Sequence, residues 1–170
     1  ASDISTVPYG SLVQVLREEE VFLAISMFHP YALTHPSGTP ITAEEVKANF
    51  AGDNLLLSKK GASLRMIGDQ FFDSCGFEPV AVCETNNISA TRSMVAQNAG
   101  VAFISESCSV NRNHIAYYPL SPAMKRLNLV VRQKDWVLNE PEQAFMDQIL
   151  NYFKQNTEHP YLAEKYSISF

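Results

Sequence analysis

One stretch decides the predicted fold: residues 79–105 read PVAVCETNNISATRSMVAQNAGVAFIS. Residues 79–83 are apolar and rich in β-branched side chains, which predicts a buried strand. Residues 85–87 are polar types that cap helices, because a side-chain oxygen accepts from free N–H groups of the first turn. Apolar side chains then recur at helical spacing, and residues 101–104 form a second apolar run. A helix between two buried strands is the βαβ pattern, which predicts a parallel sheet with ligands at the carboxyl ends of its strands.

A second unit of the same kind precedes this one at residues 55–75. An apolar strand is followed by a polar loop and by a helix that Ser63 is expected to cap. Gly76 ends this helix as a left-handed cap would. Further upstream, Thr42 and Glu45 match the capping box, which predicts a short helix after Thr42. The chain therefore contains two successive strand–loop–helix units, each with a polar helix start.

Composition excludes several classes of protein. The chain has 170 residues and a formal net charge of −5, and no basic run is longer than the two residues of Lys59-Lys60, so a nucleic-acid-binding surface is not expected. Cys75, Cys83 and Cys108 are odd in number and lack metal-ligand spacing, which argues against a disulfide framework or a zinc site. No apolar run is long enough to cross a membrane, and no signal peptide opens the sequence. We expect a reduced, cytoplasmic protein that binds no membrane.

Enzyme motifs are also missing from the sequence. We find no nucleophile elbow, no metal motif and no paired acid–base spacing, so neither an enzyme nor a cofactor is expected. His29 and His35 each precede a proline in an irregular segment and are interpreted as surface or packing residues. His114 stands alone.

Five sets of short motifs occur in an order that matches one known domain. They are EVFLAI at 20–25 leading to HPYA at 29–32, FAGDNLLL at 50–57 with GASLR at 61–65, GFEP at 76–79 with Glu84, MVAQNAGVAFI at 94–104, and YPL at 118–120 with LNLVVR at 127–132. Together they resemble the effector-binding domain of LysR-type transcriptional regulators over about residues 3–154.

This resemblance implies an α/β fold of the periplasmic-binding-protein-like (type 2) class, in which two lobes are joined by two crossing strands. The crossings would lie near residues 25–30 and 103–106. Residues 1–27 would then be a partial first lobe, 28–104 a complete second lobe, 105–154 the return into the first lobe, and 155–170 a C-terminal tail.

The sequence departs from the family pattern at its start. The winged helix-turn-helix, the linker helix and the first two β–α units of the first lobe are not present in these 170 residues. We therefore expect contact with DNA only through a helix-turn-helix domain absent from this chain, and an effector site that is half built. Unpaired strand edges are expected to favour self-association as a homodimer or tetramer.

The candidate ligand-binding residues come from three polar or strand-end segments and one position in the first lobe. They are Thr85, Asn86 and Asn87, then Ser58 and Ser63, then Phe103, Ile104 and Ser105, and finally Thr6. The alternative is that the polar residues only cap helices, although three candidates for one cap at residues 85–87 leave at least one side chain free. Arg65 and Arg92 are expected at solvated positions, with pairing to an anionic effector as the alternative.

The function implied by the resemblance is effector sensing for transcriptional control, with a small molecule bound between two lobes. The alternative is a solute-binding receptor of a transport system with the same fold, which the missing signal peptide and the free cysteines disfavour. Redox sensing is not expected either, because peroxide-sensing members carry a cysteine near the helix start that is Ser63 here.

Overall fold

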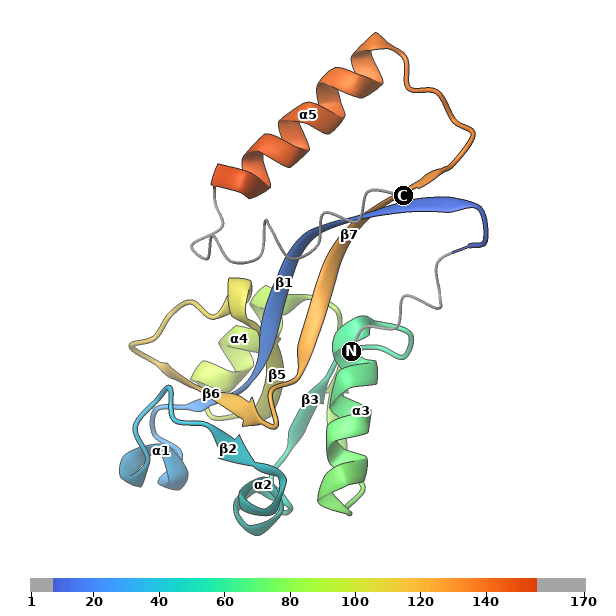
Figure 1. Cartoon of the computed structure of the whole chain (residues 1–170). Coiled ribbons are helices and arrows are strands. Elements are labelled where there is room, and N and C mark those ends of the chain that lie inside the picture. The colour runs from blue at the N-terminus through green and yellow to red at the C-terminus, as the bar shows by residue number, and fades with distance from the viewer. Residues whose placement is uncertain (1–7, 156–170) are drawn as a thin grey trace. The chain divides into compact units, whose positions relative to one another are not determined.

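The computed structural model describes residues 8–155, and its contacts divide them into two compact units (Figure 1). The first unit comprises Glu19–Arg126, and the second comprises residues 8–18 and 127–155. The predicted lobe boundaries, after residues 27, 104 and 154, remain a prediction. The first compact unit extends beyond residues 28–104 on both sides, because β1 (Ser11–Ser26) enters it at Glu19 and β6 (Ile115–Ser121) pairs with β1.

A mixed sheet forms the centre of the first unit, in the strand order β2-β6-β1-β5-β3-β4. The other strands in this order are β2 (Ile41–Thr42), β3 (Leu55–Leu57), β4 (Ala81–Glu84) and β5 (Val101–Ser105). The helices are α1 (Pro30–Thr34), α2 (Ala43–Phe50), α3 (Ser63–Cys75) and α4 (Ile88–Ala96), and a 3-10 turn η2 (Glu106–Cys108) follows β5. Strand β7 (Lys125–Gln133) pairs with β1.

The two predicted βαβ units are confirmed. Strand β3 pairs in parallel with both β4 and β5, so α3 and α4 are the crossover helices between parallel strands. The helix caps were mostly predicted correctly as well. Thr42 and Glu45 form the capping box of α2, and Gly76 ends α3 in the left-handed conformation with φ of 69°.

Helices α3 and α4 cover opposite faces of the sheet, and successive side chains of β5 point to these two faces in turn. Val101 and Phe103 belong to the core cluster that contains the buried residues of α3, whereas Ala102 and Ile104 pack in a second cluster with Val95 of α4. This alternation follows from the two-residue period of a strand. Ser105 therefore shares the α3 face with Phe103.

Two glycines permit close packing at this sheet. A Cβ at Gly68 of α3 would lie 2.9 Å from the Phe103 ring, so the helix can approach β5 only without a side chain there. A Cβ at Gly100 would lie 2.6 Å from the backbone oxygen of Asn54. Cys75 of α3 is buried in the core, and burial raises the pKa of its thiol.

One expectation about burial was wrong. The strand predicted at residues 79–83 is not buried, since Val80 and Val82 are 71% and 51% exposed. The reason is topological: β4 is the last strand in the sheet order, so among residues 8–155 only β3 flanks it.

The second unit contains the first half of β1, residues 127–133 of β7 and helix α5 (Glu140–Gln155). A backbone hydrogen bond from Lys134 to Gly10, at 2.9 Å, connects its two segments. A reciprocal cap precedes α5, because Asn139 and Glu142 each accept from the other's backbone N–H. Across residues 8–155, no helix has the length and apolar character needed to span a membrane.

Candidate functional site

A pocket of about 270 Å³ lies where β3, β4 and β5 end. Its polar lining comes from the end of β5, the loops that follow β3 and β4 and the start of α3, with Thr91 from α4 and Arg126 from β7. Its apolar lining comes from both core clusters. The lining residues are Leu56, Ser58, Ala62, Ser63, Leu64, Thr85, Asn86, Ile88, Thr91, Phe103, Ser105, Cys108 and Arg126. The carboxyl ends of parallel strands are the usual place for a ligand in a sheet of this kind.

Most of the residues predicted from the sequence meet at this pocket. Ser58, Ser63, Thr85, Asn86, Phe103 and Ser105 all line it. Their contact with a ligand stays a prediction, but their common location follows from the parallel pairing of three strands.

The remaining predicted residues do not line the pocket in the described part of the chain. Asn87 caps α4, and its side-chain oxygen accepts from the N–H groups of Ser89 and Ala90, both at 3.1 Å. Ile104 is fully buried on the α4 face of β5, because its side chain alternates with those of Phe103 and Ser105. Thr6 lies outside the described residues.

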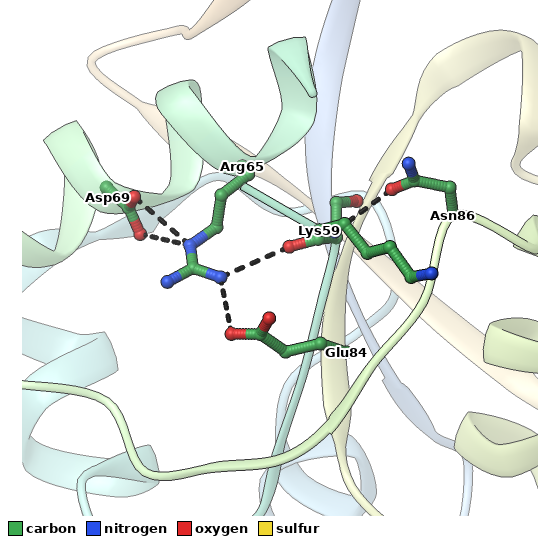
Figure 2. Close-up of polar contacts among 6 residues, drawn as sticks. Lys59, Arg65, Asp69, Glu84 and Asn86 are labelled. Carbon is green, nitrogen blue, oxygen red and sulfur yellow. Dashed lines mark hydrogen bonds and ion pairs between the residues drawn. The ribbon is translucent and has the colours of Figure 1, made fainter. Parts of the chain in front are cut away.

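The turn at residues 85–87 is more firmly bonded than expected. The Thr85 hydroxyl accepts from the Asn87 N–H at 3.1 Å, and the Asn86 side chain accepts from the Lys59 N–H at 3.0 Å (Figure 2). Only Asn87 caps α4, so the expectation that the cap leaves at least one of the three side chains free of this role is confirmed, although Thr85 and Asn86 each accept a hydrogen bond elsewhere. The bond from Asn86 joins the two polar loops that border the pocket.

Helix α3 begins without a side-chain cap. The N-cap residue is Ala62, whose methyl group cannot accept a hydrogen bond, and Ser63 is the first residue of the helix. The expectation that Ser63 caps α3 was thus wrong by one position. The N–H groups of Ser63 and Leu64 have no partner within residues 8–155. An uncapped helix start with free N–H groups presents partial positive charge to the pocket that Ser63 and Leu64 line.

Arg65 is not at a solvated position. Its side chain is 13% exposed, and it contacts Asp69 one turn along α3 and Glu84 at the end of β4 (Figure 2). The Nη1–Oε1 distance to Glu84 is 2.7 Å, and the same nitrogen donates to the Ser58 carbonyl at 3.2 Å. The hydrogen bonds that Arg65 donates to Glu84 and Asp69 raise its pKa, and the bond that it donates to the Ser58 carbonyl holds the Ser58 loop against α3.

The Arg92 side chain also makes hydrogen bonds within this chain. Its Nη1 donates to the Cys108 carbonyl at 3.1 Å and its Nη2 to the Ser89 hydroxyl at 3.3 Å. The expectation of solvated positions was wrong for both arginines, because the tertiary structure supplies acceptors that no local pattern reveals.

Ser105 carries a buried polar atom without a partner. The residue is 1% exposed, and its Oγ has no hydrogen bond in the described structure. Leaving a buried hydroxyl unpaired costs about 1–3 kcal/mol, so such groups are rare unless they serve a purpose. A ligand group in the pocket is a natural partner for this hydroxyl, because Ser105 lines the pocket.

A buried ion pair borders the pocket and was missed in the sequence. Arg126 lines the pocket, and its Nε donates to Glu19 at 2.5 Å across 107 positions of the sequence. The second oxygen of Glu19 accepts from the Ser107 N–H at 3.1 Å. Burial acts to raise the pKa of Glu19, but the hydrogen bonds from Ser107 and Arg126 outweigh it, so the pKa is lowered from its usual value of 4.5.

A second polar pocket, of about 350 Å³, lies near the amino ends of β3 and β5. It includes His29, whose Nε2 lies 3.1 Å from Asp53 and whose Nδ1 accepts from the Tyr31 N–H. Both ring nitrogens are satisfied and the ring stacks on Phe50, so His29 is a packing residue as predicted. No group of three or more potential metal ligands occurs among residues 8–155.

Comparison with known proteins identifies the domain. The sequence model of the LysR substrate binding domain matches residues 7–154. The chain is also 25% identical over 141 residues to YybE of Bacillus subtilis (strain 168), an uncharacterised HTH-type transcriptional regulator. That match covers 82% of this chain but only 46% of YybE, so the chain spans about half the length of this relative.

Two solved structures share the fold at low sequence identity. The regulatory domain of CcmR from Synechocystis PCC6803, in complex with 2-PG, matches with a TM-score of 0.71 and 18% identity, over 92% of this chain and 72% of that one. The effector binding domain of QuiR, in complex with shikimate, matches with a TM-score of 0.67 and 15% identity, over 92% of this chain and 69% of that one. The predicted fold, α/β and periplasmic-binding-protein-like, is therefore confirmed.

Proposed function

Because the chain belongs to the LysR substrate-binding domain family, we propose that it senses a small-molecule effector for a bacterial LysR-type transcriptional regulator. The observation that carries this proposal is the pocket where β3, β4 and β5 end. Six residues selected from the sequence surround it, and they come from three separate segments. Its volume of about 270 Å³ lies just below the usual range for ligand sites and therefore suits a small effector.

The chemistry of the lining supports binding rather than catalysis. Hydroxyl and amide groups from Ser58, Ser63, Thr85 and Asn86 are combined with an apolar floor that includes Phe103. This combination can orient a small polar molecule, but it offers no activated nucleophile with an adjacent base. We therefore propose no enzymatic activity.

For the whole regulator, we propose that effector binding shifts a conformational equilibrium and so controls transcription. DNA would be bound through a helix-turn-helix domain outside this sequence, in the cytoplasm, and by a homodimer or tetramer. The exposed edge strand β4 supports self-association, since an unpaired edge can accept a further strand. A transport receptor is not supported, because the family and the Bacillus relative are transcriptional regulators.

The proposal is tested by measuring thermal unfolding of the 170-residue chain with a panel of small carboxylates, phosphorylated acids and amino acids, including 2-PG and shikimate. A ligand at 100 times its Kd stabilises a protein by about 2.7 kcal/mol, which corresponds to roughly 5–10 °C for a chain of this size.

Two variants localise any binding. Ser63→Phe places a ring in the pocket and should abolish the shift, because Ser63 is an exposed lining residue at the start of α3. Gln70→Phe adds the same ring to an exposed position of α3 outside the pocket and should leave the shift intact. If no compound shifts the unfolding temperature, or if Ser63→Phe responds like the unaltered chain, this pocket is not the effector site.

A further inference from the structure

Only one of the three nitrogens of the Arg126 guanidinium makes a hydrogen bond within the described residues. The Nε donates to Glu19, whereas neither terminal NH₂ group has a partner within the described residues. The Arg126 side chain is 22% exposed and lines the pocket. Two hydrogen-bond donors of a permanently charged group are therefore available at the site.

Glu19 holds this guanidinium in one orientation. Its side chain is fully buried, with one oxygen bonded to Arg126 and the other to the Ser107 N–H. A guanidinium anchored through Nε leaves Nη1 and Nη2 side by side, and this fork matches two oxygens of a carboxylate or a phosphate. Glu19 is thus a positioning residue rather than a competitor for the fork.

The other lining residues of the pocket offer hydrogen-bond donors and include no acidic side chain. None of the lining residues is Asp or Glu. The start of α3 contributes the free N–H groups of Ser63 and Leu64, and Ser105 contributes a hydroxyl that is buried and unpaired. These features are independent of Arg126, because they come from different elements of the unit. All of them favour a negatively charged ligand group.

We propose that Arg126 and Ser105 select a small oxyanion, a carboxylate or phosphate group, and that Glu19 positions Arg126 for this purpose. The inference rests on the proposed function and deepens it, since effector sensing requires only that some small molecule binds in the pocket. It adds the charge of that molecule and the side chains that recognise it.

The test uses calorimetric titration of the 170-residue chain with inorganic phosphate and, separately, with malonate, at constant ionic strength in chloride. Saturable binding of at least one anion is expected, and the two arms distinguish a phosphate from a carboxylate site. Arg126→Gln should weaken binding by at least about tenfold, because two charge-assisted hydrogen bonds are lost. Arg112→Gln removes the same charge from a residue outside the pocket and should leave the affinity unchanged.

Arg126→Gln removes the cation that offsets the charge of the buried Glu19 carboxylate, and the variant could unfold for that reason alone. The double variant Glu19→Gln/Arg126→Gln removes both charges, so it should fold and still fail to bind the anion. Glu19→Gln alone keeps a side-chain oxygen that accepts from Nε and removes the offsetting charge, so it should bind the anion more tightly than the unaltered chain. A pair with only a structural role would instead weaken binding in all of these variants.

The inference is overturned if the double variant binds phosphate or malonate as well as the unaltered chain does, or if Glu19→Gln binds as weakly as Arg126→Gln. It is also overturned if neither anion binds while an uncharged compound gives a thermal shift that Ser63→Phe abolishes. In that last case the effector-binding function stands and only the preference for an anion is rejected.

Discussion

Replacing Ser105 with alanine should make the unliganded chain more stable. The change removes a hydroxyl that is buried and unpaired, and it leaves the strand backbone and the neighbouring Phe103 unaltered. Relief of an unsatisfied buried polar atom is worth about 1–3 kcal/mol. The missing oxygen leaves a small void whose cost offsets part of this gain, so we expect a net stabilisation of about 1 kcal/mol.

The effect is measured by urea unfolding at 25 °C and by thermal unfolding of the 170-residue chain. A gain of about 1 kcal/mol corresponds to an increase in Tm of roughly 2–4 °C for a chain of this length. The slope of the urea transition should not change, because the surface exposed on unfolding is nearly the same. Binding of an anionic ligand should become weaker in the same variant, since the ligand loses one hydrogen-bond donor.

Ser109 provides the matched control. It is also a buried serine, at 7% exposure, but its Oγ donates to the Glu106 carbonyl at 2.7 Å and accepts from Arg112 at 3.1 Å. Ser109→Ala should therefore destabilise the chain by about 1–2 kcal/mol. If Ser105→Ala destabilises the chain as much as Ser109→Ala does, Ser105 has a partner in solution and the reasoning from an unpaired hydroxyl is refuted.

Three further predictions concern stability. Gly100→Ala should lower the free energy of unfolding in urea by about 2–3 kcal/mol, because its Cβ would lie 2.6 Å from the Asn54 carbonyl oxygen. As the control, Gly52→Ala places its Cβ in open space and should change the free energy of unfolding by less than about 1 kcal/mol. Asn87→Ala removes the acceptor for two N–H groups of α4 and should cost about 1 kcal/mol; an unchanged urea midpoint would contradict the capping role. The lowered pKa of Glu19 stabilises the fold above pH 4.5, and this contribution should disappear as the pH falls through the lower folded-state pKa. Glu19→Gln should therefore show a flatter loss of stability below pH 4.5 than the unaltered chain, and equal slopes would refute the linkage.

Local patterns in the sequence were sufficient for α2, for the two βαβ units and for much of the pocket, but not for α1 (Pro30–Thr34), which lies in a segment predicted to be irregular. The apolar runs, the capping box at Thr42 and the glycine at Gly76 predicted elements that the structure confirms. Six site residues could be selected because strand ends and helix starts have recognisable local signatures, and parallel pairing brings those ends together. These signals depend only on neighbouring residues, so they can be read without the fold.

The tertiary structure decided what each of these residues does. Strand β4 is exposed because it lies at the edge of the sheet. Helix α3 begins one residue earlier than predicted, so Ser63 does not cap it and instead lines the pocket. The pairing of Glu19 with Arg126 joins residues 107 positions apart, and no spacing rule relates them. The unpaired state of Ser105 is likewise a property of its surroundings, since a hydroxyl is satisfied or orphaned only by the groups that packing brings to it.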